Sequence, residues 1–276
     1  MTSSPLPENL NDSHMHAHAH KPAHALAYSP ARVTILDIPF DNVTQKQALE
    51  KALAGFATPN SSRISGHAYF IATPNPEMLL EARKNPQFKE ILQKTDLNIA
   101  DGIGILLASR FLKTPLPERV TGVDFMLALC KHLPKGTKIF LLGAKEGVAE
   151  QVKMKLENLF PDVKIVGTFA GSPSKEDEQQ ICTQIQQSQA KILFAAYGTP
   201  KQELWLNSNL PRLQIVRLAI GVGGAFDFIA GIQKRAPKWM QKLWLEWLYR
   251  LIQEPKRIKR IYDATIEFPI TLFLTK

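Results

Sequence analysis

The strongest constraint on the fold is an alternation, from residue 32 onward, between short apolar runs and longer segments with helical spacing. The apolar runs cover residues 32–38, 67–73, 96–100, 138–142, 163–169, 191–198 and 214–220. Each is bounded by polar, glycine or proline residues, as is typical of a buried strand. Strands that alternate with helices favour a mostly parallel sheet with helices on both faces. The sequence therefore predicts an α/β fold.

Several helix starts are marked by capping residues. Thr44 and Gln47 have capping-box spacing, and Ser174 with Asp177 marks another capped start. Asn75 followed by Pro76 is an N-cap pattern with proline at the first helical position. These signals predict helices that begin just after residues 44, 75 and 174.

The composition is that of an ordinary folded protein with one large domain or two small ones. The 276 residues are 45% hydrophobic and 21% charged, which is enough apolar material for a sizeable core. Cys130 and Cys182 lie far apart within apolar helical patterns. They are predicted to be buried thiols in a reducing compartment rather than a disulfide.

The positive charge is concentrated near the C-terminus. The formal net charge is +9, and residues 231–260 hold nine basic against two acidic residues. The same stretch contains Trp239, Trp244 and Trp247, and bulky aromatics mixed with cations suit a membrane interface. The overall charge predicts an anionic partner, which could be nucleic acid, a phosphorylated substrate or an acidic membrane surface.

The chain divides into three predicted parts. Residues 1–30 are polar, contain five of the seven histidines and are expected to form a disordered leader without a metal site. Residues 31–235 form the α/β core, and residues 236–276 a basic amphipathic helical appendage. No apolar run is long enough to span a bilayer, and the N-terminus lacks a secretory pattern. We therefore expect a cytoplasmic protein, peripheral on the inner face of the cell membrane.

Helical spacing of apolar residues predicts one amphipathic helix from Trp239 to Ile252. Glu246 and Arg250 fall on its other faces, and Pro255 is expected to break it. The pattern resumes beyond the proline.

Candidate catalytic residues follow three of the predicted strands. Asp101 directly follows a strand and precedes Gly102, which is where a catalytic acid or base is often placed. Its alternative role is the N-cap of a helix over residues 103–112. Asn75 could likewise be only an N-cap, and Gln202 could simply occupy the first turn of a helix. The residues alone leave these alternatives open.

A glycine-rich turn at residues 221–227 weakly matches a phosphate-binding loop, although its glycines could serve only tight packing. The sequence contains no P-loop, no nucleophile-elbow motif, no spaced zinc ligands and no Asp-x-Asp pair. We expect neither a metal nor a cofactor. Charge on a diphosphate would then be met by arginines, for which Arg119, Arg250, Arg257 and Arg260 are candidates.

Several ordered motifs resemble the WecG/TagA/CpsF glycosyltransferase family. They are DG-x-G at residue 101, ERVTG-x-D at 118, G-x-PKQE at 198 and a long RAPKW-to-EP-x-R signature from 235. The resemblance covers about residues 32–262. Trp244 departs from it because relatives commonly have glycine there, and the leader lies outside it.

The resemblance implies a Rossmann-like core that forms a homo-oligomer, with an appendage that closes the site at an anionic membrane surface. It implies inverting transfer of N-acetylmannosamine, or its uronic acid, from a UDP-sugar to undecaprenyl-diphosphate-linked N-acetylglucosamine. It assigns the role of general base to Asp101 and places Thr73, Asn75 and Gln202 near the sugar. The four residues that it assigns to contacts with the diphosphate are Arg119, Arg250, Arg257 and Arg260.

The sequence is less consistent with three other functions. A non-catalytic nucleotide-sugar-binding module that recruits polysaccharide enzymes has no need of a base such as Asp101. A nicotinamide-dependent oxidoreductase would need a glycine fingerprint with an acidic ribose ligand, which is missing. Nucleic-acid binding lacks any accompanying recognition motif.

Overall fold

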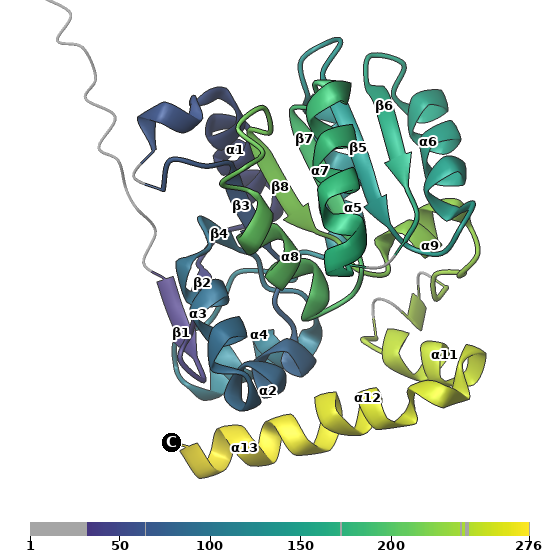
Figure 1. Cartoon of the computed structure of the whole chain (residues 1–276). Coiled ribbons are helices and arrows are strands. Elements are labelled where there is room, and N and C mark those ends of the chain that lie inside the picture. The colour runs from purple at the N-terminus through teal and green to yellow at the C-terminus, as the bar shows by residue number, and fades with distance from the viewer. Residues whose placement is uncertain (1–31, 64, 172, 238, 241–242, 276) are drawn as a thin grey trace, which may run out of the picture.

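The apolar runs form a six-stranded sheet in which neighbouring strands are parallel. The computed structural model describes residues 32–63, 65–171, 173–237, 239–240 and 243–275. The strand order is β4-β3-β8-β7-β5-β6 (Figure 1). The strands are β3 (Tyr69–Ala72), β4 (Leu97–Asn98), β5 (Lys138–Gly143), β6 (Lys164–Phe169), β7 (Ile192–Ala196) and β8 (Leu218–Gly221).

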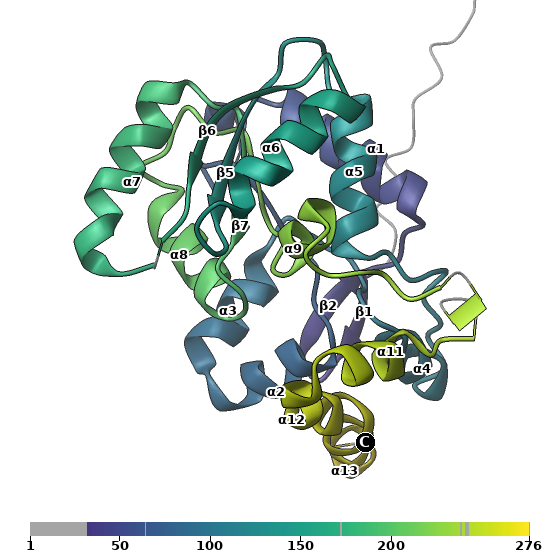
Figure 2. The same cartoon turned by 90° about the vertical axis from the view of Figure 1, so that its right-hand side faces the viewer.

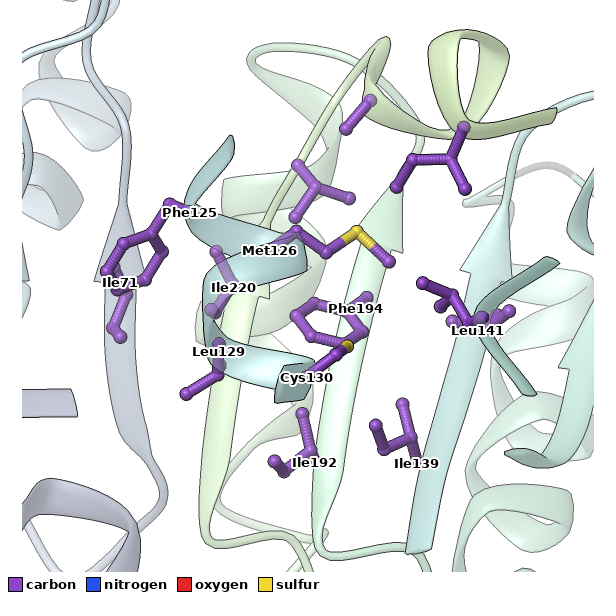
Figure 3. Packing of buried hydrophobic residues seen from close by; sticks show 14 of the residues in the cluster. Ile71, Phe125, Met126, Leu129, Cys130, Ile139, Leu141, Ile192, Phe194 and Ile220 are labelled. Carbon is purple, nitrogen blue, oxygen red and sulfur yellow. The ribbon is translucent and has the colours of Figure 1, made fainter. Parts of the chain in front are cut away.

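Helices cover both faces of this sheet, as the sequence predicted (Figure 2). In β7, Ile192 and Phe194 point into one apolar cluster, whereas Leu193 and Ala195 point into the other. Figure 3 shows the first cluster, in which Phe194 packs beside Met126. The first face is covered by α1 (Gln45–Ala57), α5 (Gly122–His132), α6 (Val148–Leu159) and α9 (Ala225–Ala230), and the second by α3 (Pro86–Lys94), α7 (Lys175–Ser188) and α8 (Lys201–Asn209).

The predicted helix starts are confirmed. Thr44 and Gln47 form a complete capping box at α1, and Ser174 accepts a hydrogen bond from the Asp177 N–H at α7. The Oδ1 atom of Asn75 accepts from the Met78 N–H at 3.0 Å and so caps α2 (Pro76–Lys84). Cys130 and Cys182 are free and buried, as expected.

The prediction of one strand over residues 32–38 is wrong. The run is interrupted by a turn in which Leu36 and Asp37 have positive φ angles of 46° and 64°. It forms β1 (Arg32–Ile35), which pairs antiparallel with β2 (Ile38–Asp41) in a separate two-stranded sheet. The reason is that Ile35 and Ile38 both face the cluster formed with α2 and α4 (Ile103–Phe111), and the chain must reverse to bury both.

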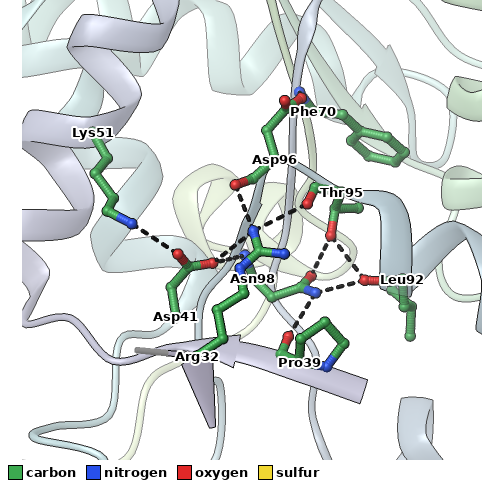
Figure 4. Close-up of polar contacts among 9 residues, drawn as sticks. All are labelled: Arg32, Pro39, Asp41, Lys51, Phe70, Leu92, Thr95, Asp96 and Asn98. Carbon is green, nitrogen blue, oxygen red and sulfur yellow. Dashed lines mark hydrogen bonds and ion pairs between the residues drawn. The ribbon is translucent and has the colours of Figure 1, made fainter. Parts of the chain in front are cut away.

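A buried polar network fixes this hairpin against β4 (Figure 4). Asp41 forms ion pairs with Lys51 at 2.8 Å and with Arg32 at 3.1 Å, and it accepts the Asn98 N–H at 3.0 Å. The Asn98 amide in turn donates to the carbonyls of Pro39 and Leu92 at 2.8 and 2.6 Å. Because buried polar groups that are fully hydrogen-bonded confer rigidity, the network holds the end of β4 in place.

The predicted single helix over residues 239–252 is also wrong. Trp244 has a φ angle of +63°, a left-handed conformation that interrupts a right-handed helix, and α11 begins only at Glu246 (Glu246–Gln253). The helix ends before Pro255, as predicted. The burial of Glu246 is a second difference, because the spacing placed this carboxylate away from the apolar face that a helix normally buries.

After α11 the chain continues through a 3-10 turn (Pro255–Arg257), α12 (Ile258–Tyr262), a π-helical turn (Asp263–Glu267) and α13 (Phe268–Thr275). Phe268 and Leu272 are buried in the same cluster as α2 and α4. The C-terminal segment therefore returns across the core beneath α2 (Figures 1 and 2). No helix within the described ranges is both long and apolar enough to cross a membrane. The predicted leader, residues 1–30, lies outside the described residues.

Candidate functional site

A cleft of about 1100 Å³ lies at the carboxyl ends of the parallel strands. In open α/β sheets this edge is where ligands bind. Residues that follow each strand of the main sheet line it, and the segment from Trp244 to Phe273 forms its opposite wall. The eight site residues predicted from the sequence all line this one cleft: Thr73, Asn75, Asp101, Arg119, Gln202, Arg250, Arg257 and Arg260.

Asp101 is half-buried at the end of β4. The N-cap of α4 is Gly102, with a φ angle of +97°, so the alternative in which Asp101 caps this helix is wrong. The Asp101 Oδ2 atom instead lies 3.5 Å from the N–H of Gly122 in the first turn of α5. Burial raises the pKa of Asp101 above that of an ordinary aspartate, while the positive charges of Arg119 and Arg250 oppose the rise.

Thr73 and Asn75 lie on the neighbouring strand end. Thr73 is buried beside Gly122, where an added Cβ would be 3.6 Å from the threonine hydroxyl. Because the Asn75 oxygen is used to cap α2, only its amide NH₂ is left to face a ligand. A Cβ on Gly104 would lie 2.7 Å from Cγ of Pro76, so the starts of α2 and α4 pack directly together. This contact brings Asn75 and Asp101 to the same side of the cleft.

Gln202 is buried and its amide connects two loops. Its Oε1 atom accepts from the N–H of Gly198, after β7, at 3.1 Å and from the N–H of Gly223, after β8, at 3.0 Å. Its Nε2 atom donates to Glu203 Oε1 at 2.7 Å. Glu203 is fully buried, and burial raises its pKa to about 7. The sequence analysis assigned no role to Glu203, which appeared there only as the last residue of the G-x-PKQE motif.

The appendage meets the core at a second buried carboxylate, Glu246. Its side chain lies 3.0 Å from Arg119, 3.6 Å from Arg250 and 4.0 Å from Arg235. These guanidinium groups come from the loop before α5, from α11 itself and from the segment after α9. One carboxylate therefore gathers three positive charges beside Asp101, and we call Arg119, Arg235 and Arg250 the arginine cluster.

Arg235 and Arg250 have further partners besides Glu246. Arg235 makes a bidentate ion pair with Asp124, at 2.5 and 3.1 Å, which raises the pKa of Arg235. Burial alone would raise the pKa of Asp124, but hydrogen bonds from Arg235 and Thr121 hold it below its ordinary value. The Arg250 guanidinium lies 4.7 Å above the ring of Phe228, a cation–π contact.

Arg257 and Arg260 lie further along the appendage wall. Arg257 pairs with Glu254, which is also held by Gln233. Arg260 pairs with Glu77 in the first turn of α2 at 2.6 Å. Both arginines thus line the cleft while paired with a carboxylate.

Glu246 and Arg235 were not anticipated. The signals that could have found them were the i,i+4 spacing of Glu246 and Arg250 and the presence of a carboxylate within a strongly basic segment. The glycine turn at residues 221–227 shows the packing role that was left open for it, because a Cβ on Gly221 would lie 2.7 Å from Gln202 Nε2. In the part of the chain that the structure describes, no group of three or more His, Cys, Asp or Glu side chains could hold a metal ion.

Comparison of the sequence with known proteins shows the family of this chain. The sequence model of the glycosyl transferase WecG/TagA/CpsF family matches residues 33–276. Proteins from Staphylococcus aureus strains MRSA252 and NCTC 8325, each named N-acetylglucosaminyldiphosphoundecaprenol N-acetyl-beta-D-mannosaminyltransferase, are 33% identical over 238 residues. The match covers 86% of this chain and 90% of each relative. The chain therefore belongs to the WecG/TagA/CpsF family and is a glycosyltransferase.

Proposed function

We propose that this enzyme transfers N-acetylmannosamine, or its uronic acid, from a UDP-sugar to undecaprenyl-diphosphate-linked N-acetylglucosamine, with inversion at the anomeric carbon. The observation that carries the proposal is the position of Asp101, a half-buried carboxylate at a strand end that faces a cleft also lined by Arg119 and Arg250. The names of the S. aureus relatives support the choice of sugar and acceptor.

Asp101 is assigned the role of general base. The acceptor hydroxyl attacks the anomeric carbon, the bond from that carbon to the diphosphate breaks, and the hydroxyl proton passes to the Asp101 carboxylate. Proton removal by a positioned base contributes about 10²–10⁴-fold to a rate. The raised pKa of Asp101 suits this role, since a more basic carboxylate accepts the proton more readily.

The arginines are assigned to the leaving group. As the sugar departs, negative charge develops on the UDP β-phosphate, and fixed cations stabilise that charge more in the transition state than in the ground state. Arg119, Arg250, Arg257 and Arg260 line the cleft and can form bidentate contacts with phosphate oxygens. Thr73, Asn75 and Gln202 are assigned to the wall near the transferred sugar.

The appendage is assigned to the inner face of the cell membrane, where a prenyl-linked acceptor is embedded. Leu243 and Ile252 are 62% and 69% exposed, and Trp239 and Trp247 are exposed in a segment whose sequence is rich in basic residues. Exposed apolar and aromatic side chains flanked by cations favour binding to an anionic headgroup region.

Vesicle sedimentation tests this assignment. We expect the double variant Leu243→Ser, Trp247→Ser to lose binding to phosphatidylglycerol-containing vesicles. Met154→Ser is the matched control, because Met154 is 64% exposed on α6, and it should bind as the wild type does. Equal binding of the double variant would contradict the membrane assignment.

Assembly as a homo-oligomer is part of the proposal, and sedimentation velocity of the purified chain tests it.

The reaction itself is tested with a panel of UDP-sugars and a synthetic prenyl-diphosphate N-acetylglucosamine acceptor. We expect UDP release and a disaccharide product with UDP-N-acetylmannosamine or its uronate, and NMR of the product should show the inverted linkage. UDP-sugar binding without UDP release or disaccharide formation across the panel would favour the non-catalytic module instead.

A further inference from the structure

The orientation of the Gln202 amide matters for the shape of the cleft. Its oxygen faces two N–H donors, those of Gly198 and Gly223, which belong to different loops. Oxygen and nitrogen of an amide have nearly the same size, so packing alone does not select between the two orientations. In the reversed orientation the NH₂ group would face both donors, and the bridge between the loops would be lost.

Glu203 supplies a third contact that favours this orientation, in addition to the two N–H donors. Its Oε1 atom accepts from Gln202 Nε2 at 2.7 Å, and an acceptor at this position requires the amide nitrogen to face it. The Thr199 hydroxyl lies 3.4 and 3.3 Å from the two carboxyl oxygens. The Glu203 side chain is fully buried, so water does not compete for these contacts.

The absence of a side chain at Gly221 leaves room for the side chains of Gln202 and Glu203. A Cβ on Gly221 would lie 2.7 Å from Gln202 Nε2 and 2.8 Å from Glu203 Oε1. Any larger residue at the end of β8 would therefore displace one side chain of the pair. Gly198 and Gly223, whose N–H groups are bound, have φ angles of +77° and +47°, so both loops adopt conformations that favour glycine.

We propose that Glu203 is a positioning residue for the donor pocket: it orients the Gln202 amide, which holds the loops after β7 and β8 together as one wall of the cleft. The inference rests on the proposed function. Both loops line the cleft, through Gly198 and Thr199 on one side and Gly223 and Gly224 on the other. Asp101 follows β4, which β3 separates from β8, so the wall is displaced from the proposed base. Loss of Glu203 should therefore raise the donor KM more than it lowers kcat.

Three variants separate orientation from simple stability. Glu203→Met keeps the length but removes the acceptor, and we expect the donor KM to rise about tenfold while kcat stays within about threefold. Glu203→Gln keeps an amide oxygen for Gln202 Nε2 and should restore the KM to within about threefold of the wild type. Glu157→Met is the matched control, because it removes an acceptor from the Ile165 N–H in the strand β6, and Glu157 does not belong to the residues lining the cleft.

Amide hydrogen exchange gives a readout independent of turnover. Exchange at Gly198 and Gly223 should accelerate in Glu203→Met but not in Glu203→Gln, with unchanged exchange at Ile165 in both. An unchanged donor KM and unchanged glycine exchange in a folded Glu203→Met protein would overturn the inference. A wild-type enzyme inactive with every UDP-sugar would instead overturn the proposed function, and the exchange experiment would still decide whether Glu203 holds the loops.

Discussion

The two walls of the cleft hold their buried carboxylates in opposite ways. On the core side, Glu203 has neutral partners, Gln202 and Thr199, and burial raises its pKa to about 7. On the appendage side, Glu246 lies among the guanidinium groups of Arg119, Arg235 and Arg250. The core wall is thus fixed by hydrogen bonds between adjacent loops, whereas the α11 part of the appendage wall is joined to the core through charge.

This difference indicates which wall can respond to a substrate. Hydrogen bonds from Gly198 and Gly223 to Gln202 connect loops that the sheet already places side by side. The arginine cluster is instead drawn together by a carboxylate, and a diphosphate is another anion that the same groups can bind. We expect the core wall to keep its shape when the donor is absent and the appendage wall to depend on which anion is present.

The largest effect on turnover is expected from substitution of Asp101, which follows β4. Asp101→Asn removes the proposed base while preserving size, and kcat should fall by about 10²–10⁴-fold with UDP binding nearly intact. Asp96→Asn is the matched control, because Asp96 precedes the same strand at its other end, where it accepts from the Phe70 N–H at 2.7 Å. Near-normal turnover of Asp101→Asn in the prenyl-acceptor assay would remove Asp101 from the mechanism.

The next largest effect is expected from loss of the Glu246 carboxylate, which connects α11 to the core through the arginine cluster. Glu246→Gln leaves the arginine cluster without its carboxylate, and breaking a buried ion pair by removing one partner costs about 3–5 kcal/mol. We expect faster amide exchange in α11 and a fall of at least about tenfold in kcat/KM. Glu267→Gln removes an exposed partner of Lys84, at 3.3 Å, and should cost less than about 1 kcal/mol. If α11 exchanges at the same rate in the wild type and Glu246→Gln, charge does not hold the appendage.

The smallest effect concerns stability and pH on the core side. The pKa of Glu203 is about 7 in the folded protein and near 4.5 when unfolded, so the folded state binds the extra proton between these values. Its contribution to stability is fully present below about pH 4.5 and is lost as the pH rises through about 7. The loss is roughly 3 kcal/mol.

Urea unfolding at pH 5 and pH 8 measures this contribution. Glu203→Gln has no proton to lose, so its free energy of unfolding relative to the wild type should improve as the pH rises. Glu157→Gln controls for loss of a carboxylate outside the cleft. Parallel pH dependence of Glu203→Gln and the wild type would show that Glu203 does not titrate in this range.

Much of the core was predictable because its signals are local. The helix starts at Thr44, Asn75 and Ser174 follow from side chains that cap a neighbouring N–H three residues later. Thr73, Asp101 and Gln202 line one cleft because they follow strands of a parallel sheet, whose carboxyl ends meet at one edge. The split of residues 32–38 was not predictable, since the turn at Leu36 and Asp37 is imposed by burial of Ile35 and Ile38 in one cluster.

The appendage was the least predictable region. Its periodicity favoured a continuous helix, but Trp244 adopts a left-handed conformation and the helix begins at Glu246. Apolar spacing also assigned Glu246 to a face away from any core, whereas the structure buries it among arginines that lie up to 127 residues away in sequence. Periodicity describes which residues share a face, but it does not say which face turns inward when the partner surface is charged.

The order of residues along the chain was enough to predict the alternation of strands and helices, the caps, the edge of the sheet where the site lies and the family of the chain. Each of these features depends on contacts between residues near in sequence or on motifs that can be recognised directly in the amino-acid sequence. Three arrangements became known only from the folded chain: Asp101 faces Gly122 and does not cap α4, Gln202 and Glu203 connect two loops, and Glu246 gathers the arginine cluster. These arrangements depend on which distant side chains share a buried volume, where the cost of an unpaired polar group selects the partners.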